Sequence, residues 1–252
     1  MAANTPGQPA LTDHVTRDFS RPAVALAVGA HPDDVEFGGG ATLAKWAAAG
    51  CVVHHLVCTD GSKGTWNAAA DIAALVATRQ DEQRAAAKAL GATGSVTFLG
   101  QVDGELGTTL ELRGAVAEVI RRVKPDVVLG HDPWKRYRLH PDHRAAGFLV
   151  CDAIVAARDP LFFPEQGLAP HRPSALLLWE ADEVNHIEDV TGYVDTKLAT
   201  LEAHASQFES TMSAVDDEGL ETFRRRIRER LASQGERIGT GAAELFAAVT
   251  DI

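Results

Sequence analysis

Short apolar runs alternate with stretches of helix-forming residues along most of this chain, and this alternation constrains the fold more than any other feature. The run AVALAVG at residues 23–29 ends in glycine, and CVVHHLVCT at 51–59 follows it after a helical stretch over 41–49. Apolar runs of this kind are typical of strands covered on both faces. A strand, a helix and a second strand in this order favour a parallel sheet.

The alternation continues through most of the sequence. Further strands are predicted over 96–99, 126–130, 174–181 and 186–190, and helices over 71–90, 109–123, 141–157, 196–208 and 218–232. We therefore expect an α/β fold, Rossmann-like, with a mostly parallel sheet and helices on both faces. A chain of 252 residues with 45% hydrophobic content can bury one sizeable core. We expect one domain over residues 1–252, with a flexible N-terminal segment over 1–20 and a C-terminal helical extension over 210–252.

The acidic balance of the chain narrows the function classes. A net charge of -11 argues against binding to nucleic acid or to an anionic membrane, because both need clusters of Lys and Arg. No run approaches the roughly 18 to 20 apolar residues of a membrane helix, and the start of the chain lacks the pattern of a secretory signal. The three cysteines lie among apolar residues without C-x-x-C spacing, which suits a reduced compartment. We expect a cytoplasmic protein with no nucleic-acid or membrane partner.

Polar residues gather after two of the predicted strands. HPDD at 31–34 follows the first strand, and HPDH at 140–143 follows the strand at 126–130 after a loop that begins with His131 and Asp132. In open parallel sheets, ligands bind beyond the carboxyl ends of the strands. Both tetrapeptides are therefore candidates for one functional site.

Their spacing indicates a metal centre. His31 and Asp34 are three residues apart at a predicted helix start, so their side chains can converge on one ion. His140 and His143 repeat the spacing, and either could supply a third ligand. Two imidazoles and one carboxylate fit a catalytic zinc site that leaves a position open for water. Asp33 points in a neighbouring direction, where a carboxylate can act as a general base.

Longer motifs surround these tetrapeptides: AHPDDVEFGGG at 30–40, TDGSKG at 59–64, TRQDEQRAAAKALG at 78–91, HPDHRAAG at 140–147 and, more weakly, HASQF at 204–208. Over about residues 24–208 the chain thus resembles the LmbE-like or PIG-L family of zinc-dependent N-acetylglucosaminyl deacetylases, which includes mycothiol- and bacillithiol-pathway deacetylases. The resemblance implies the LmbE-like fold. It also implies hydrolysis of a small N-acylated amino sugar or conjugate, such as an N-acetylglucosamine derivative, by a zinc-bound water. Family members commonly form homo-oligomers, and another divalent transition metal can stand in for zinc.

The resemblance assigns roles to single residues. It implies three zinc ligands, namely His31, Asp34 and His143. It implies that Asp33 deprotonates the attacking water. His140 would stabilise the oxyanion or give a proton to the leaving amine, and Asp142 would orient His140 through a hydrogen bond.

Three further positions carry weaker matches, each with an ordinary structural alternative. His204 matches a residue proposed as an acid in some members, whereas HxSQ could simply brace a helix. Arg79 matches an arginine near the substrate, but an ion pair with Glu82 one turn on explains it equally well. Asp103 matches an aspartate that binds sugar hydroxyls, and the Asp-Gly pair also suits a turn.

One departure from the family pattern affects oxyanion assistance. Some members carry a mobile tyrosine two residues before the position of His140, and here Arg138 holds that place while Tyr137 is one residue earlier. Either side chain could contact the substrate. The basic loop around them could also meet an acidic substrate.

Other functions fit parts of the pattern. An amidase acting on a thiol conjugate or antibiotic precursor would use the same centre. A non-haem iron oxygenase would use His31-Pro32-Asp33 and a distant histidine as a facial triad, although such sites are built on antiparallel strands. A non-catalytic nucleotide binder would use Gly38–Gly40 for phosphate, but these glycines lack the G-x-G-x-x-G spacing and are better explained by close helix packing.

Overall fold

The computed structural model describes residues 9–252, and its eight strands form one sheet in the order β1-β7-β8-β6-β5-β2-β3-β4. The strands are β1 (Ala10–Arg17), β2 (Val24–Gly29), β3 (Val52–Thr59), β4 (Val96–Gln101), β5 (Val127–His131), β6 (Ala175–Trp179), β7 (Glu183–Asp189) and β8 (Ala243–Val249). The helices are α1 (Asp34–Ala48), α2 (Ile72–Leu90), α3 (Leu110–Val123), α4 (Pro141–Arg158), α5 (Val194–Glu202) and α6 (Asp217–Glu236). Four short helical turns complete the described elements: η1 (Pro164–Gln166), η2 (Thr191–Tyr193), η3 (Ala205–Gln207) and η4 (Phe208–Met212).

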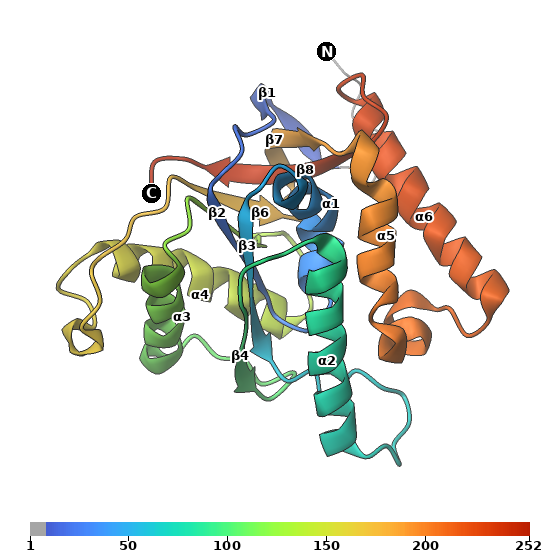
Figure 1. The fold of residues 1–252 in the computed structure, drawn as a ribbon, viewed down its shortest axis with the longest axis horizontal. Coiled ribbons are helices and arrows are strands. Elements are labelled where there is room, and N and C mark those ends of the chain that lie inside the picture. The colour runs from blue at the N-terminus through green and yellow to red at the C-terminus, as the bar shows by residue number, and fades with distance from the viewer. Residues whose placement is uncertain (1–8) are drawn as a thin grey trace.

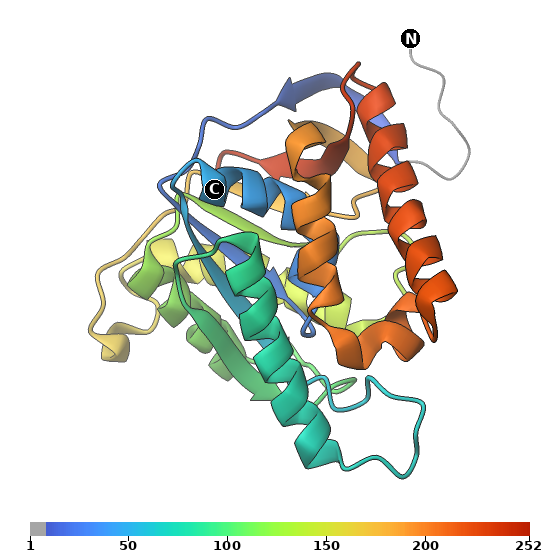
Figure 2. The same cartoon turned by 45° about the vertical axis from the view of Figure 1, so that its right-hand side comes forward.

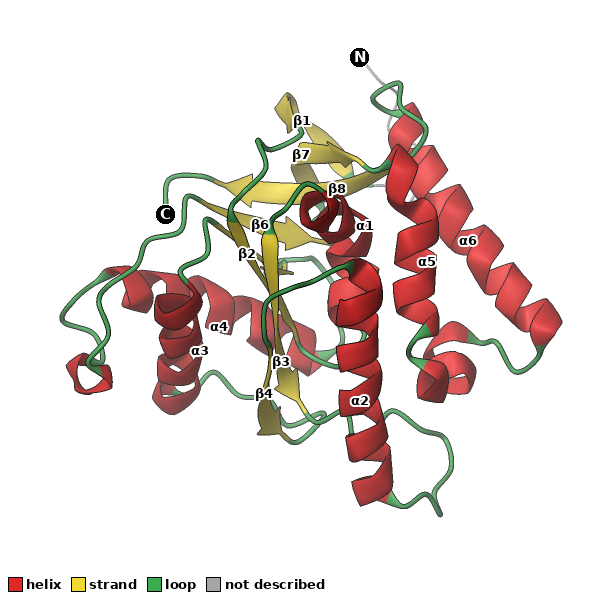
Figure 3. Cartoon of the chain, viewed as in Figure 1, coloured by secondary structure: helices red, strands yellow, loops and turns green. Residues whose placement is uncertain are grey.

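The predicted fold class is confirmed. The strands β4, β3, β2, β5 and β6 are parallel to their neighbours in this order. Only β8 runs antiparallel among the described strands, between β6 and β7. Figures 1 and 3 show the sheet between two groups of helices, with α3 and α4 on one side and α1, α2, α5 and α6 on the other.

Successive residues of the central strands supply the two cores. Leu26 and Val28 of β2 face α3 and α4, whereas Ala25 and Ala27 face α1. This alternation follows from the period of two along a strand, and burial on both faces explains why the run carries no polar residue. The helices α5 and α6 form a further layer outside α1, as Figure 2 shows, and share a third apolar cluster with it.

Two predictions about the chain ends need correction. Residues 10–17 form strand β1 instead of a flexible segment, because they pair with β7 and pack the partly buried side chains of Leu11 and Val15 against its apolar residues. Residues 1–8 of the expected segment lie outside the described residues. The expected helical extension over 210–252 is right for α6 but wrong for β8, which is inserted into the sheet and buried at Ala243–Phe246.

The three consecutive glycines in α1 allow the helix to approach the sheet. A Cβ atom on Gly38 would lie 2.3 Å from the indole ring of Trp179 on β6, and one on Gly39 would lie 3.3 Å from Leu129 on β5. Gly39 also leaves helical geometry, with φ -143 and ψ 21. The glycines thus serve close packing, as the sequence analysis favoured over phosphate binding. Within residues 9–252 no helix combines the length and apolarity needed to span a bilayer.

Candidate active site

The functional residues meet where the strand order reverses. The chain passes from β2 to β3 and β4 on one side and returns to β5 on the other. Such switch points hold ligands in open α/β sheets. His31 follows β2, His131 ends β5 and Glu180 follows β6, and all three line a pocket of about 530 Å³.

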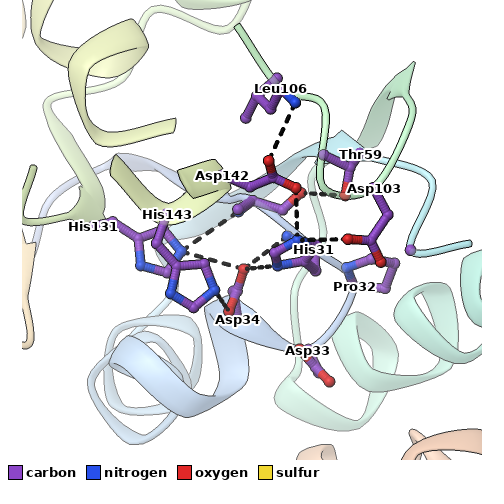
Figure 4. A network of polar contacts seen from close by, with 12 residues as sticks. His31, Pro32, Asp33, Asp34, Thr59, Asp103, Leu106, His131, Asp142 and His143 are labelled. Carbon is purple, nitrogen blue, oxygen red and sulfur yellow. Dashed lines mark hydrogen bonds and ion pairs between the residues drawn. The ribbon is translucent and has the colours of Figure 1, made fainter. Parts of the chain in front are cut away.

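His31, Asp34 and His143 form a compact set of candidate metal ligands (Figure 4). One donor atom from each lies within 4.8 Å of the others. Nδ1 of His31 is 3.2 Å from Oδ2 of Asp34, and Nε2 of His143 is 3.4 Å from Oδ1 of the same carboxylate. The backbone N–H of His31 also donates to Oδ2 of Asp34 at 2.7 Å, which fixes the turn between the two residues. The structure therefore brings together the three residues that the sequence analysis named as ligands.

The second nitrogen of His31 is held by carboxylates. Nε2 lies 3.0 Å from Oδ2 of Asp142 and 3.2 Å from Oδ1 of Asp103. Asp142 is fully buried and also accepts hydrogen bonds from the backbone N–H groups of Gly104 and Leu106. The prediction that Asp142 orients His140 is therefore wrong: its imidazole partner is His31.

This donor set fits a divalent cation. A metal-binding histidine usually gives its other N–H to a carboxylate, as His31 can do toward Asp142, which leaves Nδ1 for the ion. Burial opposes charge on His31, but hydrogen bonds to Asp103, Asp142 and Asp34 raise its pKa to about 12. A cation in place of the Nδ1 proton would meet the carboxylate of Asp34, while Nε2 could still donate to Asp142. Burial lowers the pKa of His143 to about 4, so this ring is neutral, as metal binding requires.

Arg138 lies behind the histidine rings instead of in the pocket. Its Nη1 is 2.7 Å from Oε2 of Glu180, 3.3 Å from Nδ1 of His131 and 3.2 Å from Nδ1 of His143. Tyr137 is 87% exposed and has a left-handed φ of 58°. The pocket lining includes neither side chain. The structure thus places neither side chain in the pocket, because Tyr137 faces solvent and Arg138 is anchored by Glu180. Substrate contact by either residue stays a prediction.

His131 was not assigned a role from the sequence, although it stands at the end of a strand. The N–H of the Trp179 indole donates to its Nδ1 at 3.0 Å, and its Nε2 lies 3.2 Å from Oδ2 of Asp34. Because an indole N–H can only donate, Nδ1 accepts and Nε2 carries the hydrogen. His131 therefore helps His31 to hold the same oxygen of the Asp34 carboxylate.

Asp33 is buried beside this cluster, and Figure 4 shows its carboxylate pointing away from the histidine rings. Its Oδ2 lies 3.4 Å from Nη2 of Arg79. Burial raises the pKa of Asp33 to about 7, and the positive charge of Arg79 only partly opposes this. A carboxyl group with a pKa near the working pH is suited to general base catalysis.

Arg79 is 2% exposed and braces this corner of the pocket. Its guanidinium donates to the carbonyl oxygens of Pro32 at 2.6 Å and Gly61 at 2.9 Å. The alternative of a surface ion pair with Glu82 is wrong, because Glu82 accepts hydrogen bonds from Ser206 instead.

His140 and Asp103 both line the pocket. The ring centroid of His140 is 4.6 Å from that of His31 and 4.7 Å from that of His143. Burial, helped by the charge of His31, lowers the pKa of His140, so the ring can stay neutral and exchange a proton. Asp103 contacts His31 and accepts the backbone N–H of Lys63, which partly occupies the group expected to meet sugar hydroxyls.

His204 does not reach the pocket. Its ring is fully buried, and Nε2 lies 3.2 Å from Oε2 of Glu36. The pocket lining does not include this ring, so the structure gives no contact through which His204 would act directly on a substrate.

Several residues that line the pocket had no role predicted from the sequence. Trp179 and Glu180 could have been found from the strand-end rule, because they close β6. Lys63, Gln207, Thr211 and Arg230 also line the pocket. The last three come from the chain after α5, which only the tertiary fold brings to this edge.

The mostly parallel sheet carries a compact His/Asp/His cluster and a neighbouring buried carboxylate at its switch point. These features define a class of protein: α/β proteins with a candidate metal-assisted hydrolytic centre. The chain belongs to the PIG-L family, since a family profile described as GlcNAc-PI de-N-acetylase matches residues 26–154. This confirms the resemblance drawn from the motifs.

Named relatives extend the match. The diacetylchitobiose deacetylase of Thermococcus kodakarensis is 34% identical over 197 residues, covering 77% of this chain and 73% of the relative. A 1D-myo-inositol 2-acetamido-2-deoxy-alpha-D-glucopyranoside deacetylase of Streptomyces avermitilis is 35% identical over 167 residues, or 56% of each chain. The solved structure of N,N'-diacetylchitobiose deacetylase from Pyrococcus horikoshii superposes with a TM-score of 0.82 at 30% identity, covering 91% of this chain and 84% of that one.

Proposed function

We propose that this protein is an N-deacetylase that hydrolyses the acetamide of an N-acetylglucosamine-type substrate, with Zn²⁺ bound by His31, Asp34 and His143. The observation that carries the proposal is the convergence of this ligand set and the buried Asp33 carboxylate on one pocket. The relatives named as sugar deacetylases support the choice of reaction. Bound zinc supplies Lewis acidity, which polarises a carbonyl oxygen and makes water more acidic.

The residues of the chain divide the proton transfers. Asp33 accepts a proton from the attacking water as the C–O bond forms. His140, next to the ligand rings, stabilises the oxyanion through a ring N–H. The proton that Asp33 has taken passes to the nitrogen, directly or through His140, as the C–N bond breaks. Water and the amide are consumed, and acetate and the free amine are formed. Asp142 and Asp103 hold His31, and His131 holds Asp34, so the ligands stay fixed during the reaction.

The space around the site supports a substrate longer than one acetylated ring. A second cavity of about 370 Å³ adjoins the pocket, and the two share Phe37, Gly38, Glu180 and Arg230 in their lining. A second sugar ring or another conjugated group could extend in this direction. The same cavity could also accommodate thiol conjugates or antibiotic precursors, which are alternative substrates of the same reaction.

The metal assignment favours one of three candidate ligand groups. The other two combine His31 with Asp103 and His140, or His131 with His143 and Glu180. They are less suitable because Nε2 of His31 is already held by Asp142, and Nδ1 of His131 accepts from Trp179. We also propose a homo-oligomer in the cytoplasm, on the family pattern and on three cysteines that remain free thiols.

An amine-release assay tests the proposal. N-acetylglucosamine, N,N'-diacetylchitobiose and an inositol-linked N-acetylglucosamine are supplied to the zinc-loaded enzyme and to enzyme treated with a chelator. Release of amine and acetate in equal amounts, lost with the chelator and regained with Zn²⁺, is expected for at least one substrate. Release from none of them, or release that is unchanged by the chelator, would contradict the proposal.

A further inference from the structure

The backbone of Asp33 has an unusual conformation. Its φ is 102° and its ψ is -25°, in a region that residues other than glycine rarely adopt. Such a conformation persists only where the surroundings hold it. Here the N–H of Asp33 donates to Oε1 of Gln83 on α2 at 3.0 Å. Gln83 is therefore the side chain that ties down the strained peptide.

The orientation of Gln83 is itself determined by its neighbours. Its Nε2 donates to Oε1 of Glu36 at 2.8 Å and lies 3.1 Å from Nδ1 of His55. A carboxylate oxygen can only accept, so the amide nitrogen must face Glu36 and the amide oxygen must face Asp33. Gln83 is fully buried, so these contacts fix the amide in one orientation.

Glu36 is held in turn by His204. Nε2 of His204 donates to Oε2 of Glu36 at 3.2 Å, and both side chains are fully buried. His204 stands at the start of η3, just after α5. A chain of hydrogen bonds thus runs from the end of α5 through α1 and α2 to the peptide of Asp33. We call His204, Glu36 and Gln83 the positioning chain.

We propose that the positioning chain holds the Asp33 carboxylate in its reactive place by fixing the peptide N–H of Asp33. The inference rests on the proposed function, in which Asp33 is the base. If Gln83 no longer accepts from this N–H, φ can relax toward common values, and rotation about that bond moves Cβ and the carboxylate with it. A misplacement of about 1 Å at a reacting group can cost about 100-fold in rate. His204 is accordingly a positioning residue.

Kinetic variants test the chain at both ends. Gln83→Leu removes the acceptor of the Asp33 N–H, and we expect kcat per zinc-loaded site to fall by about 100-fold with KM within about twofold. His204→Leu removes the donor to Glu36, and we expect a fall of about tenfold. His204→Gln keeps an N–H donor and should recover most of the wild-type kcat, which a merely space-filling role would not require.

The matched control is His186→Leu. His186 is 1% exposed and pairs with Glu188 at 2.9 Å, so it repeats the burial and the glutamate contact of His204, but on β7 and outside the pocket lining. This variant should lose stability while keeping kcat per folded site within about twofold. A fall equal to that of His204→Leu would show that losing any buried His–Glu pair impairs the enzyme, and it would overturn the proposal.

A second readout does not depend on turnover. NMR-detected hydrogen exchange of the Asp33 amide, measured on the metal-free protein, should be faster in Gln83→Leu and His204→Leu than in wild type or His186→Leu. If wild type releases no amine from any substrate, the proposed function fails while exchange still decides whether the chain holds Asp33. Unchanged exchange of this amide in both variants, or full kcat in an active enzyme, would overturn the positioning chain.

Discussion

Asp33 combines burial, a strained backbone and a cationic neighbour at one position. Burial favours the protonated carboxyl, and Arg79 at 3.4 Å favours the carboxylate. The balance leaves a group that can both take and return a proton near neutral pH. Its side chain points away from the ligand set, so the base and the metal ligands can be separated by mutation.

Asp33→Asn should lower kcat by about 100- to 10,000-fold, because the amide keeps the shape of the side chain but cannot accept a proton from water. Zinc content should stay near that of wild type. Steady-state kinetics combined with metal analysis check this expectation. A variant that keeps wild-type kcat would remove Asp33 from the mechanism.

Asp142 offers a sharper test, because the family resemblance implied His140 as its partner, whereas its carboxylate contacts His31 in the structure. Asp142→Asn leaves one acceptor oxygen where two now accept from His31, Gly104 and Leu106. We expect zinc affinity to fall by about 10- to 100-fold, as for other carboxylates that hold a metal-binding histidine. Competition with a chromogenic chelator measures it. Unchanged zinc affinity would contradict a role of Asp142 in holding the metal-binding His31.

At the scale of elements, the approach of α1 to β6 places the HPDD turn. Gly38 and Trp179 leave no room for a Cβ atom between helix and strand. Trp179 also donates to His131, so the same contact connects helix packing to the orientation of the pocket histidines.

Gly38→Ala should destabilise the fold by about 1 to 3 kcal/mol, the usual cost of overpacking a core. Gly192→Ala is the control, because a Cβ atom there would meet nothing within 4 Å. Urea unfolding followed by circular dichroism compares the two. Equal free energies of unfolding for both variants would refute the packing argument.

The sequence predicted the central elements well and the edge elements poorly. The runs that became β2 and β5 are apolar on both faces, so periodicity alone reveals them. Strand β8 (AELFAAV) is rich in alanine, which favours helix, and only its place between β6 and β7 makes it a strand. Strand β1 mixes polar and apolar residues at the sheet edge, which resembles a loop.

The same reasoning applies to the site. Motif spacing and strand ends predicted His31, Asp34 and one of His140 and His143 as ligands, and the family resemblance chose His143. The partner of Asp142 and the burial of His204 were not predicted, because both depend on contacts between elements more than 100 residues apart. The local sequence pattern does not reveal contacts between residues so far apart in the chain.

At the scale of the whole molecule, an ion that binds only the folded protein should raise its free energy of unfolding. Adding Zn²⁺ to the metal-free protein should raise Tm, with about 2.7 kcal/mol of stabilisation when free zinc is 100 times its Kd. For a chain of this size this is roughly 5 to 10 °C. Differential scanning calorimetry measures the shift, and His143→Ala should abolish most of it. An equal shift in that variant would place the ion elsewhere.

All described strands, from β1 near one end of the chain to β8 near the other, belong to one sheet. This supports the single domain expected from the sequence, which stays a prediction for the chain. The active-site pocket draws lining residues from His31 to Arg230. Its shape therefore depends on most of the chain being folded.

The left-handed backbone conformation of Asp33 means that selection for stability and selection for activity favour different residues at this position. Glycine adopts such a φ without steric cost, so Asp33→Gly relieves strain at the same time as it deletes the base. In a library of variants selected only for thermal stability, Asp33→Gly should be enriched. In a library selected for turnover, it should be lost. Ranking variants only by melting temperature would thus favour a more stable protein that has lost its catalytic activity.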